Sequence, residues 1–224
     1  MTELHVLRVF IGSDGRGGNR LGVFLDGSAV ERDRRQEVAA ELGFSETVWV
    51  DAVDDPVAHI AIFTPAREMP FAGHPTVGTA WLLRETGRPV EVLRVPAGDV
   101  RSWRDGELTW VRARAAWAAG LMDPQQLPTA SEVESLQIGA GNLYAWAWED
   151  EPAGRVRSRF LARDFGIAED EATGAAAVIL GDRLARPITI RQGLGSEIVV
   201  RPDSRERTVD IGGRVELVEI RPYP

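Results

Sequence analysis

Short runs of β-branched, aromatic and leucine residues recur along most of the chain, and glycine- or proline-rich turns separate them. This pattern predicts short strands. The expected strands are 3–11, 21–25, 47–50, 58–63, 90–95, 99–103, 107–111, 142–149, 156–161, 188–191, 197–201, 208–211 and 214–220.

Three segments have the spacing of helices instead. Residues 31–42 are charged and amphipathic, and the segment ends at Gly43, as helices often do. Residues 75–86 and 171–185 are apolar on most sides, which predicts two buried helices. Strands and helices do not alternate strictly, so the pattern favours an α+β fold over a doubly wound parallel sheet. Prolines interrupt 115–141, where no element is assigned.

Each buried helix begins with polar residues. Gly73 lets the backbone approach a ligand closely, and Pro75 occupies a first-turn position that needs no N–H. A buried helix start offers free N–H groups and a partial positive charge, which together suit a carboxylate. His74 adds a group that titrates near neutral pH. The second helix follows the acidic segment 169–171 and Thr173-Gly174.

One such helix in each half of the chain suggests two pseudo-symmetric domains that face one cleft. We expect an N-terminal domain over 1–112, with its central helix at 75–86. The C-terminal domain then spans 113–224, with its central helix at 171–185. The last strand can pair back with the N-terminal domain.

Several acidic residues are candidates for proton transfer. Glu46 has the apolar neighbours Phe44, Val48 and Trp49, and apolar surroundings raise the pKa of a carboxyl. A solvated loop glutamate is the ordinary alternative, and the local sequence favours it. Asp170 can serve as a helix cap, and nothing in the residues alone selects it over Glu169 or Glu171.

Composition excludes several kinds of chemistry. The 224 residues include no cysteine, and all 26 basic residues are arginine, so thiolate chemistry and lysine Schiff bases are excluded. A formal net charge of -8 disfavours general nucleic-acid or anionic-membrane binding. Three histidines without a ligand pattern predict no metal site. No apolar run is long enough to span a bilayer and no secretion signal is visible, so we expect a cytoplasmic location.

The glycine-rich loop 15–19 lacks the G-x-G-x-x-G spacing and precedes a strand, so a nucleotide site is disfavoured. Asn19 is the polar residue of this loop that can reach a ligand.

Several patches, in order along nearly the whole chain, carry a family resemblance. They are Gly18-Asn19 with 21–24, Phe44–Thr47, Ile62–Pro65 with Glu68, Pro70–Thr79, Glu169–Gly174, Gln192-Gly193 and Arg201-Pro202. Together they resemble the PhzF-like family of phenazine-biosynthesis isomerases, relatives of diaminopimelate epimerase.

The resemblance implies two similar domains, each a curved, barrel-like sheet around a central helix, with the active site between them. It implies that Glu46 is the general base and acid and that His74 and Asp170 orient the substrate. Substrate contacts are expected from Asn19, Gly73, Thr173, Gly174 and Ala175. The resemblance also implies a small carboxylate substrate, no metal, no organic cofactor and a homodimer.

Three features depart from the family pattern. Ala175 stands where serine is frequent, Arg20 replaces a usual proline, and the chain is short after residue 112. A trimmed second domain predicts a more open cleft. We therefore expect a cofactor-independent isomerase or epimerase, with a family member that binds a small molecule or a partner without turnover as the alternative.

Overall fold

Strands make up most of the fold. The computed structural model describes residues 2–137, 139 and 141–224, and this part of the chain forms one mixed sheet of 15 strands. The first half contains β1 (Thr2–Ile11), β2 (Gly17–Phe24), β3 (Glu46–Asp54), β4 (Val57–Phe63), β5 (Glu68–Met69), β6 (Val92–Val95), β7 (Gly98–Asp105) and β8 (Leu108–Arg114). The second half contains β9 (Gln125–Gln126), β10 (Asn142–Asp150), β11 (Arg155–Ala162), β12 (Glu169–Asp170), β13 (Ile188–Gln192), β14 (Ser196–Asp203) and β15 (Thr208–Tyr223).

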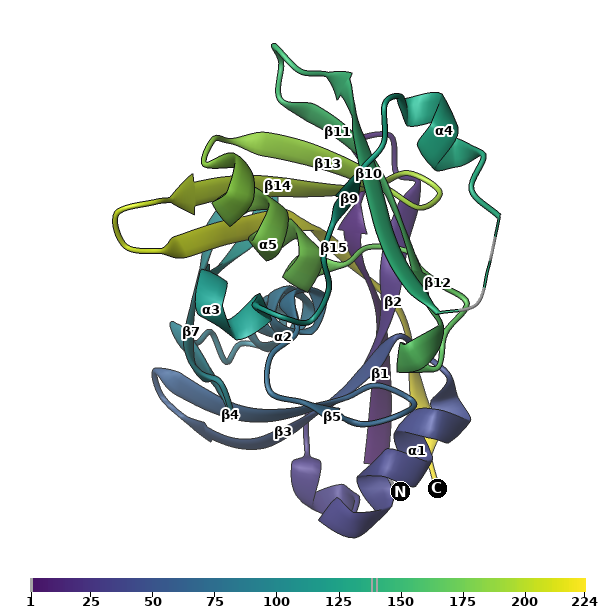
Figure 1. Cartoon of the computed structure of the whole chain (residues 1–224). Coiled ribbons are helices and arrows are strands. Elements are labelled where there is room, and N and C mark those ends of the chain that lie inside the picture. Colours follow the sequence, from purple (N-terminus) through teal and green to yellow (C-terminus); the bar gives the residue numbers. More distant parts are fainter. Residues whose placement is uncertain (1, 138, 140) are drawn as a thin grey trace.

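The long last strand closes the sheet on itself. The strands follow the order β1-β2-β3-β4-β6-β7-β8-β15, and β15 also pairs with β1, from Thr2↔Tyr223 to Ile11↔Arg214. The first part of β15 lies between β8 and β14, and its second part continues along β1. In Figure 1 this ring of strands surrounds α2 (Gly73–Glu85), which is seen nearly end-on.

The sheet continues from β15 through β14, β13, β11, β10 and β9. Helix α5 (Gly174–Leu184) lies in the curve of these strands and packs against β14 and β15 (Figure 1). The other helices are α1 (Arg35–Leu42), α3 (Ala115–Ala118) and α4 (Ala130–Glu134), with 3₁₀ turns at Gly27–Ala29, Arg32–Arg34 and Arg163–Phe165.

Small residues allow α2 to lie inside the barrel. Every residue from Gly73 to Ala80 is buried. A Cβ atom on Gly78 would lie 2.5 Å from Cδ2 of Leu21, so glycine is what lets the helix approach β2. Helix α1 covers the outside of the barrel, where Val38 and Ala39 join an apolar cluster with Trp49. It ends at Gly43 in the left-handed conformation, as predicted.

The expected α+β fold, with barrel-like sheet curved around central helices, is confirmed, and several details differ from the prediction, among them the following three. Segments 208–211 and 214–220 form one strand, because Gly212 and Gly213 pack against the rings of Trp110 and Phe10 instead of turning. Strand β2 begins at Gly17, earlier than expected. Helix α5 begins at Gly174, because Glu169 and Asp170 pair with β11 as a short strand.

No helix in the described part of the chain combines the length and apolar character needed to cross a membrane. The division into domains at residue 112 stays a prediction.

Candidate active site

The first turns of α2 and α5 meet face to face. A Cβ atom on Gly73 would lie 2.7 Å from Cα of Gly174, and one on Gly174 would lie 2.6 Å from Cα of Gly73. Both positions therefore need glycine. Neither helix has a side-chain cap at its N-terminus. Their first N–H groups, with the positive ends of two helix dipoles, are thus available to a single anion.

This contact gives a stability prediction. Gly174→Ala is expected to lower the free energy of unfolding by about 1–3 kcal/mol, because the methyl group forces the two helix starts apart. Gly139→Ala is the matched control, since a Cβ atom there meets nothing within 4 Å. Urea denaturation measures both variants, and equal stability of the two would contradict the close contact.

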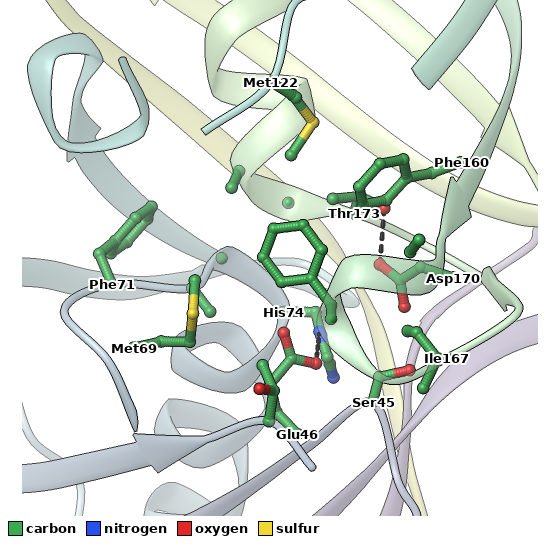
Figure 2. A pocket seen from close by; sticks show the side chains of 17 residues that line it. Ser45, Glu46, Met69, Phe71, His74, Met122, Phe160, Ile167, Asp170 and Thr173 are labelled. Atoms are coloured by element: carbon green, nitrogen blue, oxygen red, sulfur yellow. Dashed lines mark hydrogen bonds and ion pairs between the residues drawn. The ribbon is translucent and has the colours of Figure 1, made fainter. Parts of the chain in front are cut away.

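A pocket of about 460 Å³ of empty space, partly open to solvent, lies beside the two helix starts. Figure 2 shows that side chains from both halves of the chain point into it. Most of its wall is apolar, and no arginine lines it. The lining residues are Ser45, Glu46, Thr64, Met69, Phe71, Ala72, Gly73, His74, Met122, Phe160, Ala162, Phe165, Ile167, Asp170, Thr173, Gly174 and Ala175.

Glu46 begins β3 and faces this apolar wall. Only 14% of its side-chain surface is exposed, and among the described residues its Oε2 atom makes no regular hydrogen bond. Burial raises the pKa of the Glu46 carboxyl well above its usual range, and the nearby charge of Asp170 raises it further. Glu46 is therefore not the solvated loop glutamate that its local sequence favours.

His74 lies next to Glu46 in α2. Its Nδ1 atom is 3.3 Å from Oε2 of Glu46, and its side chain is 2% exposed (Figure 2). Burial lowers the pKa of His74 to about 3, and the backbone of Arg20 only partly opposes this effect. The imidazole is consequently neutral at neutral pH, so its contact with Glu46 is polar and not an ion pair.

The neutral state of His74 couples stability to pH. Below pH 6.5 the unfolded chain protonates this histidine, whereas the folded chain keeps it neutral down to about pH 3. The free energy of unfolding should therefore fall as the pH drops through this window, by up to about 1.4 kcal/mol per pH unit from this residue. Urea denaturation between pH 4 and 7 should show a shallower slope for His74→Asn than for wild type. His59→Asn, which changes a 40% exposed side chain, is the control. Equal slopes for wild type and His74→Asn would contradict the neutral, buried state.

Asp170 faces the pocket from the second half of the chain, at the end of β12. Its Oδ1 atom accepts a hydrogen bond from Nδ2 of Asn19 at 2.7 Å, and its Oδ2 atom accepts one from Oγ1 of Thr173 at 2.6 Å. Burial raises the pKa of Asp170, and these donors oppose the effect by stabilising the charged form. The two carboxyl groups therefore differ, because both oxygens of Asp170 accept short hydrogen bonds, whereas Oε2 of Glu46 has a longer contact with His74 and no regular hydrogen bond among the described residues.

The two neighbours of Asp170 point elsewhere. Glu169 forms a bidentate pair with Arg159, with both distances 2.7 Å. Glu171 accepts hydrogen bonds from the backbone N–H of Leu194 at 2.8 Å and from the hydroxyl of Ser196 at 2.7 Å. Of the three acids, Asp170 is the one that lines the pocket.

The structure brings most of the expected site residues together. Glu46, His74, Asp170, Gly73, Thr173, Gly174 and Ala175 all line the pocket. Asn19 is 2% exposed and lies behind Asp170, where its amide is already bonded. The sequence did not indicate a role for the apolar wall or for Gln192. The Nε2 atom of Gln192 donates hydrogen bonds to the carbonyl oxygen of Asp170 and to the hydroxyl of Thr173. Wall residues such as Phe160 and Phe165 look like ordinary core positions in the sequence.

The described residues contain no group of three or more His, Asp or Glu side chains placed to hold a metal ion. The pocket offers a buried carboxyl in contact with a neutral imidazole, a carboxylate that accepts two hydrogen bonds, and two helix starts.

Comparison with known proteins identifies the family. Residues 9–115 match the family model of phenazine biosynthesis-like proteins, PhzC-PhzF. Trans-2,3-dihydro-3-hydroxyanthranilate isomerase of Pseudomonas aeruginosa is 31% identical, over 91% of this chain and 89% of its own length. The fold is similar to that of a phenazine biosynthesis PhzC/PhzF protein from Clostridium difficile, with a TM-score of 0.79 and 18% identity over 100% of both chains. It is also similar to a P. aeruginosa protein described as a predicted epimerase, with a TM-score of 0.75 and 24% identity over 100% of this chain and 99% of that one. The resemblance read from the motifs is thereby confirmed, and the chain belongs to the phenazine biosynthesis-like PhzC/PhzF family and is an isomerase.

Proposed function

We propose that this isomerase moves a proton within a small carboxylate substrate by acid–base catalysis, with Glu46 as the proton carrier. The difference between the two pocket carboxyl groups supports this assignment. Glu46 is buried, and among the described residues its Oε2 atom has a 3.3 Å contact with the neutral imidazole of His74 and no regular hydrogen bond, which suits it to accepting and releasing a proton. Asp170 already accepts two hydrogen bonds, which suits it to orienting the substrate as a charged acceptor.

The two helix starts are the proposed anchor for the substrate carboxylate. N–H groups of Gly73 and His74 from α2 and of Gly174 and Ala175 from α5 would donate to it. The aromatic and methionine side chains would hold an apolar substrate body. Anchoring at one end fixes the reacting carbon next to Glu46, which lowers the entropic part of the barrier.

The proposed reaction has two proton transfers. Ionised Glu46 takes a proton from a substrate carbon, so that a C–H bond breaks, an O–H bond forms and the electron pair spreads into the adjacent unsaturated system. The helix N–H groups and neutral His74 stabilise the anion. Glu46 then returns the proton to another carbon, which gives an isomer. For an epimer, the planar anion must present its opposite face to Glu46 before the proton returns to the same carbon.

The organisation of the protein around this site is part of the proposal. We propose that units 1–112 and 113–224 face each other across the pocket, because its wall draws on both halves of the chain. The homodimer and the cytoplasmic location stay predictions. Light scattering of the purified protein tests the homodimer and should give the mass of two chains.

The proposed function is tested by measuring both the conversion and the binding of candidate substrates. Trans-2,3-dihydro-3-hydroxyanthranilate is the first probe because a relative is named for acting on it, and amino-acid carboxylates such as proline complete the panel. Proton NMR for the first probe, and optical rotation for amino acids such as proline whose two enantiomers share one NMR spectrum, should show conversion of at least one probe. Binding of a probe, seen as thermal stabilisation, with no conversion across the panel would support the alternative of a binding protein that has lost turnover.

A further inference from the structure

Asn19 uses its whole side-chain amide inside the protein. Its Nδ2 atom donates to Oδ1 of Asp170 at 2.7 Å and to the carbonyl oxygen of Ala172 at 2.9 Å. Its Oδ1 atom accepts a hydrogen bond from the hydroxyl of Ser45 at 3.0 Å. The side chain is 2% exposed and absent from the pocket wall. Both the donor and the acceptor group are bonded within the protein, outside the wall of the pocket.

The partners of Asn19 sit beside the two acids of the pocket. Ser45 precedes Glu46 directly, and β2 pairs in parallel with β3 from Leu21↔Glu46 onward. Asp170 and Ala172 belong to the segment between β11 and α5, in the other half of the chain. A single amide therefore links the strand that carries Glu46 to the segment that carries Asp170.

The backbone around Asn19 is fixed to the second half of the chain. The N–H of Gly18 donates to Oγ of Ser196 at 2.8 Å, and that hydroxyl donates to Glu171 at 2.7 Å. A Cβ atom on Gly17 would lie 2.3 Å from the backbone nitrogen of Ser196. This close approach leaves Asn19 little freedom to turn toward the pocket.

We propose that Asn19 is a positioning residue, whose amide holds the Asp170 carboxylate in place and, through Ser45, fixes its position relative to Glu46. This inference rests on the proposed function and replaces the direct substrate contact expected from the sequence. The amide holds Asp170 as a charged acceptor, because its N–H donates to the ionised form. Loss of this donor leaves Asp170 with the hydroxyl of Thr173 as its strongest contact.

Other titratable side chains also influence the titration of Asp170, and the substitutions used in the test leave these side chains unchanged. Those that face it or flank it are Glu46 on β3, His74 on α2, Tyr144 on β10, and Glu169 and Glu171 on its own segment.

The test follows the Asp170 carboxyl directly by carbon-13 NMR of protein labelled at aspartate, with Asp170→Asn to assign the signal. In Asn19→Ala the titration midpoint of Asp170 should move up by about one pH unit, the value of one hydrogen bond to a charged group. Asn142→Ala, at the other asparagine of the chain, is the matched control and should not move it. Ser45→Ala is a milder second variant, expected to move the midpoint in the same direction by less.

An unchanged Asp170 midpoint in folded Asn19→Ala and Ser45→Ala would overturn the proposal. Kinetics give a second readout once a substrate is found, since a positioning role lowers kcat and leaves KM nearly unchanged. A raised KM with normal kcat would instead show direct substrate binding and overturn it as well. The NMR result needs no substrate, so failure of the proposed function is distinguishable from failure of this inference.

Discussion

Glu46→Gln is expected to lower turnover by about 10²–10⁴-fold, the usual contribution of a general acid–base group. Glutamine has nearly the same shape but cannot exchange a proton with carbon. The neighbouring imidazole does not replace it, because burial lowers the pKa of His74 to about 3 and leaves it a weak base. The measurement is the rate of product formation by NMR with the probe that wild type converts.

The fold of this variant should be intact. The Glu46 carboxyl is costly to ionise where it lies, so an uncharged amide is tolerated there, and thermal unfolding should occur at or above the wild-type temperature. Glu151→Gln changes an exposed turn residue and is the matched control, with wild-type turnover expected. Turnover within a few-fold of wild type in Glu46→Gln would remove Glu46 from the mechanism.

Asp170→Asn is expected to lower turnover by about a hundredfold, the scale of a substrate misplaced by about 1 Å. An asparagine side chain cannot accept from both Asn19 and Thr173 through two carboxylate oxygens, so the donors around it must rearrange. The change also removes a negative charge that raises the pKa of Glu46. The limb of the pH–rate profile that reports Glu46 should therefore move to lower pH.

Glu169→Gln is the control for this variant, because it neutralises the adjacent acid, which pairs with Arg159 away from the pocket. It should leave the position of that limb close to wild type. A limb that stays in place in Asp170→Asn would contradict the electrostatic coupling of the two pocket acids.

The buried helix start was the most predictable part of the site. Gly73, His74 and Pro75 show a glycine for close approach, a titratable side chain and a first-turn proline within three residues. All three residues shape the same helix start, so their order in the sequence is enough to recognise it. What the spacing could not reveal is that Gly73 touches Gly174, since that contact joins residues 101 positions apart and depends on how the sheet curves.

The environment of Glu46 was not predictable from its own neighbours. Phe160, Phe165 and Ile167, which line the pocket together with Glu46, come from the other half of the chain. Local sequence therefore favoured a solvated glutamate, and only the family resemblance pointed to a catalytic one. The local sequence also could not distinguish Glu169, Asp170 and Glu171. Their different hydrogen-bond partners are distant in sequence or on other strands, and these are Arg159, Asn19 and Ser196, respectively.

Most of the fold was predictable from the spacing of hydrophobic residues along the chain and from the turn residues between them. One exception, inside β15, has a physical cause, since Gly212 and Gly213 are ordinary turn residues that here make room for two aromatic rings. A glycine kept for packing and a glycine kept for a turn look alike in a sequence.

Solvent deuterium incorporation tests the central assignment most directly. In D₂O, the wild-type protein should place deuterium on the substrate carbon that receives the proton, because the protonated Glu46 carboxyl exchanges its proton with solvent before returning it to the bound anion. Asp170→Asn should do so more slowly, and Glu46→Gln should incorporate none above background while remaining folded. Full incorporation by Glu46→Gln would show that another group carries the proton and would contradict the mechanism.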